Sequence, residues 1–203
     1  MDAELINEGM NALAKIDRDV AEAYERLGAP APRIRPKGFE TFLSTIVSQQ
    51  ISTEAAQTIL GRVKSILPDM SADALLTVAD QDLRQAGLSF RKIEYAKGLA
   101  EAVYQGHFDV DGLEQMTDEE AITEITALRG FGRWSAEIYL MFSLNRRDIF
   151  PADDLALQVA LGRLKQLTDK PTPKQARALI EHWAPWRSVG SLFLWHYYRG
   201  APA

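Results

Sequence analysis

The chain has 203 residues, which is enough for one large domain or two small ones with a substantial core. It contains no cysteine and only three widely spaced histidines, which excludes disulfides and cysteine-ligated clusters and disfavours a histidine-rich metal site. With 28 acidic and 23 basic residues the net charge is −5, which argues against a nucleic-acid binder that depends on basic side chains.

The ends and apolar runs of the sequence carry no membrane signal. The opening stretch MDAELINEGM is acidic and has no apolar core of the kind that a signal peptide needs. No apolar run approaches the roughly 20 residues that span a bilayer. We expect a cytoplasmic protein with no membrane partner.

Apolar residues recur at helical spacing along nearly the whole chain, and no segment alternates convincingly with period two. The sequence therefore predicts an all-α fold of about ten helices. The first predicted helix spans residues 2–27 and ends at the proline-rich stretch 28–36. The others span 39–51, 52–67, 72–79, 80–86, about 90–103, 117–130, 133–144, 153–167, 172–184 and 185–200.

Several helix ends have residues typical of caps. Ser52 is a predicted N-cap, Thr117 or Asp118 is another, and Thr172 is a third with Pro173 in the first helical position. Gly130 is expected to follow the end of the helix that begins at residue 117.

The stretch LRGFGRWSA (128–136) predicts two helices joined by a tight turn with glycines at alternate positions. Gly130 and Gly132 lack a Cβ, so another backbone can approach closely. Amides at the start of the second helix then form an anion site that needs no basic side chain, and a DNA phosphate would suit it. An ordinary helical hairpin with glycine caps explains the same pattern.

A pair of acids, Asp153 and Asp154, precedes the apolar-periodic run that begins at Leu155. Asp153 is expected to cap the helix and Asp154 to lie in its first turn, where the helix dipole stabilises a carboxylate. A role confined to starting the helix is the simpler alternative.

Together these motifs resemble the helix–hairpin–helix DNA glycosylase superfamily, and within it the 3-methyladenine DNA glycosylase II branch in a short form without the N-terminal β-rich domain. The stretch IVSQQIS (46–52) is similar to the segment that this family inserts into the minor groove. HWAPWRSVGSLFLWHYY (182–198) is similar to the closing helix of the branch.

The resemblance implies two helical lobes around an active-site cleft. One lobe would comprise about 1–37 and 150–203, and the other about 38–149, which contains the hairpin. Asp154 would be the catalytic residue, with Asp153 beside it. The residues expected to contact DNA are Gly130, Gly132, Arg133, Trp134, Ser135, Gln50, Ile51, Ser89 and Phe90. Backbone carbonyls of Thr126, Leu128 and Phe131 would hold a monovalent cation, Na⁺ or K⁺.

The implied activity is base excision repair of alkylated purines, 3-methyladenine and 7-methylguanine, in duplex DNA. The damaged nucleotide must be flipped out of the helix. An N3- or N7-alkylated purine is cationic and leaves without a general acid, so the enzyme needs an aromatic pocket and a carboxylate to stabilise the oxocarbenium-like sugar. The pocket residues would be Trp134, Trp195, Ile138 and Leu155. Both tryptophans could instead be plain core residues.

The sequence departs from other branches at Trp134, where the resemblance places a lysine in bifunctional members. We therefore expect a monofunctional hydrolase without lyase activity, acting as a monomer and requiring no organic cofactor or catalytic metal. Ile138 and Leu155 replace tyrosines that are frequent in longer relatives, which leaves the range of substrates open. Two alternatives also remain open, namely excision of hypoxanthine or ethenoadenine, and a non-catalytic lesion-binding module.

Overall fold

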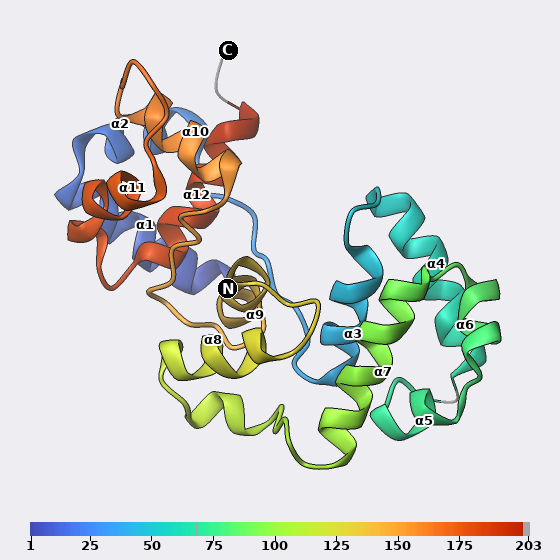
Figure 1. The fold of residues 1–203 in the computed structure, drawn as a ribbon. Helices are drawn as coiled ribbons and strands as arrows, with labels where there is room; N and C mark the ends of the chain where they lie inside the picture. The colour runs from blue at the N-terminus through green and yellow to red at the C-terminus, as the bar shows by residue number, and fades with distance from the viewer. Residues whose placement is uncertain (68, 201–203) are drawn as a thin grey trace. The chain divides into compact units, whose positions relative to one another are not determined.

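A computed structural model of the protein describes residues 1–67 and 69–200. Within these residues it contains twelve α-helices and two short 3₁₀-helices and no strand, which confirms the all-α prediction (Figure 1). None of the helices in these two ranges combines the length and apolar character needed to cross a bilayer. The helices form two compact units, one built from Met1–Arg35 and the chain from Glu137 onward, the other from Pro36–Ala136.

The first unit is built around its last helix. Helix α12 packs against α1, α2 and α10. Gly190 lies where α12 meets the buried Trp183, and a Cβ there would come within 2.5 Å of the indole. The helices of this unit are α1 (Ala3–Ile16), α2 (Arg18–Leu27), α10 (Leu155–Leu164), α11 (Pro173–Leu179), η2 (Glu181–Trp183) and α12 (Arg187–Gly200).

The second unit is centred on α7, which packs against α3, α5 and α6. The ring of the buried Phe42 makes edge contacts with Phe108 and Phe131, at centroid distances of 5.3 and 5.5 Å. Phe131 thereby ties the turn after α8 to the core. The helices are α3 (Phe39–Ser48), α4 (Thr53–Ile66), α5 (Ala72–Thr77), α6 (Asp80–Ala86), α7 (Phe90–Tyr104), η1 (Gly112–Gln115) and α8 (Asp118–Ala127).

Helix α9 (Arg133–Phe142) starts in the second unit and ends in the first. The boundary at which the chain leaves the second unit and returns to the first therefore lies between Ala136 and Glu137, whereas the sequence analysis put it near residue 150. The reason lies in packing: the Phe142 ring is 6.0 Å from the Trp195 ring of α12, and the Arg33 guanidinium lies 4.3 Å from the Phe142 centroid.

The capping residues were predicted well, because caps are local. Ser52 accepts from the amide of Ala55, and Thr117 and Thr172 each form a capping box. Some helix ends were wrong. The helix expected to span 39–51 ends at Ser48, and the one expected to reach Gly130 ends at Ala127, because the backbone leaves the helical region at Gln49 and Leu128, which both have a ψ of 130°.

The single helix expected over residues 2–27 is wrong, because the chain breaks at Asp17. This residue has extended backbone angles and caps both neighbours, ending α1 and accepting from the amide of Val20 in α2. Its side chain is 1% exposed. Both carboxylate oxygens accept from Lys165 Nζ at 2.7 Å, and Oδ2 also lies 2.7 Å from Trp183 Nε1 and 3.0 Å from His182 Nε2.

These contacts set the protonation of the Asp17 carboxyl. Burial by itself would raise its pKa, but the hydrogen bonds from Lys165, Trp183 and His182 and the charge of Lys165 outweigh burial and hold the pKa below its ordinary value. A carboxyl with a lowered folded-state pKa stabilises the fold above its unfolded-state pKa, and this stabilisation is lost as the pH falls through the folded-state pKa.

Replacing the buried carboxylate in Asp17→Ala removes the side-chain cap of α2 and strips Lys165 of one of its two acidic partners. We expect the free energy of unfolding to fall by about 3–5 kcal/mol, the usual cost of breaking a buried ion pair from one side. Urea denaturation at neutral pH measures it. Glu22→Ala, which breaks only the exposed pair with Arg18, serves as the control and should unfold like the wild type.

The wild type and Asp17→Ala also test whether the pKa of the Asp17 carboxyl is lowered in the folded protein. Between about pH 5 and about pH 3 the wild type should lose more stability than Asp17→Ala, which lacks the carboxyl. Parallel loss of stability in both proteins would contradict a lowered pKa at Asp17.

Candidate functional site

The structure assigns the N-cap of helix α10 to the other acid of the pair than the sequence predicts. Asp154, rather than Asp153, is the N-cap, and its Oδ1 accepts from the Leu157 amide at 3.0 Å. Asp153 lies outside the helix, is exposed, and pairs with Arg177 at 3.6 Å. The two neighbouring acids therefore occupy distinct environments, and only Asp154 is held by the helix.

A second element fixes the Asp154 carboxylate. The indole Nε1 of Trp195, on α12, donates to Asp154 Oδ1 at 3.2 Å. Trp195 is half-buried, and its ring is tilted by 38° against Phe142. The sequence predictions of Asp154 and Trp195 thus fall on side chains that touch, although 41 positions separate them. The carboxylate is oriented by donors from two helices, which is the preorganisation that charge stabilisation requires.

The remaining predicted pocket residues differ in exposure. Leu155, next to the cap, is 62% exposed, and Trp134, in the first turn of α9, is 46% exposed. Ile138 is buried in the core. Leu155 and Trp134 thus expose apolar surface, whereas Ile138 is packed in the core. Their role as a base pocket stays a prediction.

The hairpin turn depends on Gly130. Its φ of 94° lies in the left-handed region, and a Cβ there would come within 2.4 Å of the Tyr95 ring. At Gly132 a Cβ would meet nothing within 4 Å, so the space beside it is open on the protein side. The Ala136 amide donates to the Gly132 carbonyl at 3.2 Å and starts the hydrogen bonding of α9. Amides ahead of Ala136, including that of Ser135, stand at a helix N-terminus, a position that favours anions in general.

Arg133 follows the turn and is engaged within the protein. Its guanidinium forms two bonds to the Glu119 carboxylate, at 2.7 and 3.2 Å. This pairing neutralises the one basic side chain that was expected to contact DNA from the hairpin. Backbone amides and the helix dipole, rather than Arg133, are the features of the hairpin suited to an anion.

The segment after α3 is fastened to the hairpin by a residue that the sequence analysis missed. Gln49 Nε2 donates to the Gly130 carbonyl at 2.7 Å. Next to it, Gln50 takes a left-handed conformation, and Ile51 is 37% exposed. The pair Gln49–Gly130 spans 81 positions, so no periodicity in the sequence could reveal it.

Lys92 of α7 contacts the chain just before this segment. Its ammonium donates to the Val47 carbonyl, in the last turn of α3, at 2.7 Å, and burial lowers its pKa. The two predicted insertion residues, Gln50 and Ile51, therefore follow directly on a stretch of chain that Lys92 and Gln49 hold in place.

Ser89 and Phe90, expected to contact DNA, lie at the start of helix α7, where the sequence predicts a helix to begin. Ser89 is its N-cap and accepts from the Lys92 amide, and Phe90 is its first residue. Phe90 is 75% exposed, and the Arg84 guanidinium lies 4.2 Å from its ring centroid. Exposed aromatic rings of this kind stack on bases in nucleic-acid complexes, and a DNA contact at Phe90 stays a prediction.

The carbonyls expected to hold a monovalent cation lie around the end of α8. Leu128 O already accepts from the Phe131 amide at 3.2 Å, and Thr126 is in the last turn of the helix, where carbonyls have no intrahelical donor. Oxygen ligands of this kind suit hard cations. A Na⁺ or K⁺ at Thr126, Leu128 and Phe131 stays a prediction.

This chain is similar in sequence to known DNA repair proteins. Residues 43–185 match the family described as HhH-GPD superfamily base excision DNA repair protein. DNA-3-methyladenine glycosylase 1 of Schizosaccharomyces pombe is 32% identical, and the alignment covers 96% of this chain and 92% of that protein.

Two solved structures are also similar. A DNA-3-methyladenine glycosidase from Bacillus halodurans superposes with a TM-score of 0.84 at 34% identity, covering 93% of this chain and 87% of that one. The S. pombe 3-methyladenine DNA glycosylase, solved in complex with abasic DNA, gives a TM-score of 0.83 at 29% identity, covering 96% and 98%. On the extent of both matches, this chain belongs to the HhH-GPD superfamily of base excision DNA repair proteins.

Proposed function

We propose that this protein is a DNA glycosylase that hydrolyses the N-glycosidic bond of alkylated purines in duplex DNA. The expected substrates are 3-methyladenine and 7-methylguanine, and the product is an abasic site. The names of its relatives support this substrate class. The observation that carries the proposal is the Asp154 carboxylate, which Leu157 and Trp195 orient at the start of α10.

A fixed carboxylate is the main catalytic group that this reaction requires of the protein. Alkylation at N3 or N7 gives the purine a positive charge, so the base departs without being protonated. Positive charge then develops on the sugar, and a fixed carboxylate lowers the energy of that state. Asp154 supplies the carboxylate. The hydrogen bonds from the Leu157 amide and the Trp195 indole hold it in place before the substrate arrives, so that little reorganisation accompanies the reaction.

Binding to DNA by a protein with net charge −5 requires sites that do not depend on excess basic residues. The turn at Gly130 and Gly132 offers backbone amides to phosphate, and Gln50 and Ile51 extend from a segment anchored to that turn. The groove-inserting role of these two residues rests on the family resemblance and on their exposure.

Asp154→Asn tests the catalytic role. It keeps the N-cap acceptor but removes the charge, so we expect the rate of 3-methyladenine release to fall by about 100-fold or more. Duplex DNA treated with a methylating agent is incubated with each protein, and the free bases are separated by chromatography. Asp153→Asn is the matched control, since it removes the adjacent exposed acid, and should act like the wild type.

The same assay separates the alternatives. Release of hypoxanthine or ethenoadenine without methylated purines would keep the hydrolase and change the substrate. Binding to an abasic duplex without release of any base would leave a lesion-binding module. Equal loss of activity in both asparagine variants would remove the special role of Asp154.

Trp195→Phe tests the second hydrogen bond. It keeps an aromatic ring and the cap at Leu157 but removes the donor to Asp154, so kcat/KM for alkylbase release should fall roughly tenfold. Trp186→Phe makes the same change in a ring that lies 5.4 Å from Arg147, away from Asp154, and should leave kcat/KM unchanged. Equal values for the two variants would mean that the indole donor does not matter.

Gln49→Leu tests the tie between the insertion segment and the hairpin. The change keeps the size of the side chain and removes the bond to Gly130, so we expect the Kd for an abasic duplex to rise roughly three- to tenfold. Gln105→Leu, at the exposed end of α7, is the control. Fluorescence anisotropy gives both values, and an unchanged Kd in Gln49→Leu would refute the positioning role.

A further inference from the structure

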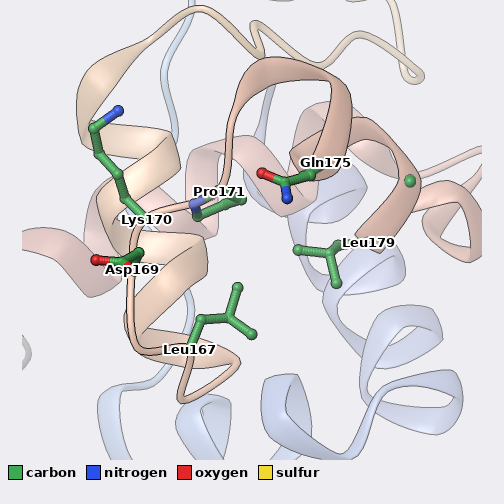
Figure 2. Close-up of a pocket in the computed structure, with 7 residues that line it drawn as sticks. Leu167, Asp169, Lys170, Pro171, Gln175 and Leu179 are labelled. Carbon is green, nitrogen blue, oxygen red and sulfur yellow. The ribbon is translucent and has the colours of Figure 1, made fainter.

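Two cavities of the first unit lie outside the carboxylate site, and their polar side chains differ in how they are hydrogen-bonded. One, of about 520 Å³, lies beside α11, and Leu167 and Leu179 point toward one another across it (Figure 2). Its charged side chains are Asp169 and Lys170, and Lys170 already donates to Gln158, while Gln175 belongs to the Thr172 capping box. The cation of this lining is therefore engaged within the protein, and the remaining charge is an acid, so the lining does not favour an anion.

The other cavity, of about 340 Å³, is lined by the stretch from Pro30 to Arg33 and by one side of α12. The α12 residues that face it are Leu192, Trp195, His196 and Arg199. His196 is engaged with the Leu27 carbonyl at 3.2 Å. Two guanidinium groups, those of Arg33 and Arg199, are therefore the charged groups of this cavity.

These cations lack acidic partners. Within residues 1–67 and 69–200, no carboxylate forms an ion pair with Arg33, Arg35 or Arg199. Burial lowers the pKa of the Arg33 guanidinium, and the charges of Arg35 and Arg199 lower it further. The positive charges of these three arginines are thus not neutralised by acids of the described residues, although the chain has five more acidic than basic residues.

Arg33 is also held in position. Its amide donates to the Met1 carbonyl at 3.0 Å, and the Met1 amino group donates to its carbonyl at 2.8 Å. The guanidinium lies 4.3 Å from the Phe142 centroid and 5.9 Å from that of Trp195. Stacking against rings uses the face of a guanidinium and leaves its N–H donors in the plane available to an anion.

The cavity adjoins the candidate catalytic residue through one side chain. Trp195 lines the cavity and donates its indole N–H to Asp154. An anion beside Arg33 and Arg199 would therefore lie one side chain away from the carboxylate at which the sugar is expected to react.

We propose that Arg33 and Arg199 bind a phosphate of the DNA backbone that flanks the extruded nucleotide. This inference rests on the proposed function. Turning a nucleotide out of the duplex rearranges the backbone on either side of it, and phosphates close to the protein then need compensating cations. Guanidinium groups match phosphate oxygens in geometry as well as charge.

Salt dependence of binding tests the proposal directly. Each phosphate neutralised by the protein contributes about 0.9 to the slope of log Kd against log salt concentration. With a duplex that carries a stable abasic analogue, the Arg33→Gln/Arg199→Gln double variant should show a slope lower than that of the wild type by about 0.9. Its Kd at low salt should rise on the order of tenfold.

Arg18→Gln is the matched control, because Arg18 is an exposed arginine of the same unit that pairs with Glu22. Its slope should equal that of the wild type. Arg33 is half-buried, and its replacement could lower the stability of the double variant. The single variant Arg199→Gln changes only an exposed position on α12, so its slope should still be lower than that of the wild type. An unchanged slope in the double variant, or an equal decrease in Arg18→Gln, would overturn the proposal.

Inorganic phosphate distinguishes a site for DNA from a site for the free ion. Its titration is followed through the NMR resonance of the Trp195 indole N–H. A shift in that resonance together with the expected change of slope supports the proposal, whereas a shift without a change of slope assigns the cavity to free phosphate. If methylated bases are released normally but the slope is unchanged, the proposed function stands and this inference fails.

Discussion

The most consequential interaction in the molecule is the pair of hydrogen bonds that Asp154 accepts, one from the start of its own helix and one from α12. A carboxylate on a flexible loop would have to be ordered during the reaction. Here the amide of Leu157 and the indole of Trp195 fix it beforehand, and α12 is itself fixed by packing against α1, α2 and α10. The position of one acid thus depends on the packing of most of the first unit.

The second unit is proposed to contact DNA through backbone groups more than through the basic side chains around its hairpin. Its Arg133 at the hairpin is paired with Glu119, and its Lys92 ammonium is bound to a carbonyl. The backbone groups are those of the turn at Gly130, where a Cβ would meet the Tyr95 ring, and of the segment that Gln49 ties to it. Affinity built on backbone amides is set by geometry, so these supports matter more than the overall charge of the protein.

Local features of this fold could be predicted from the sequence, whereas contacts between distant residues could not. Ser52, Thr117 and Thr172 each accept from the amide three residues further along, so the local sequence is enough to predict their capping roles. Asp154 and Trp195 were found through the family resemblance, not through periodicity. The break at Asp17 was missed because the apolar spacing continues across it, and its cause, Lys165, lies 148 positions away. The Gln49–Gly130 bond and the unpaired Arg33 are equally non-local.

The cluster at Asp17 also constrains how this family can vary. Losing the acid leaves the Lys165 ammonium with only Asp19, which is partly exposed, while losing the lysine leaves the 1% exposed Asp17 carboxylate without its cation. Either substitution alone gives a less stable protein, whereas replacing both residues by apolar residues of similar volume is often neutral for stability. Substitutions at positions 17 and 165 should therefore co-vary among relatives, linking the break in the N-terminal helices to the end of α10.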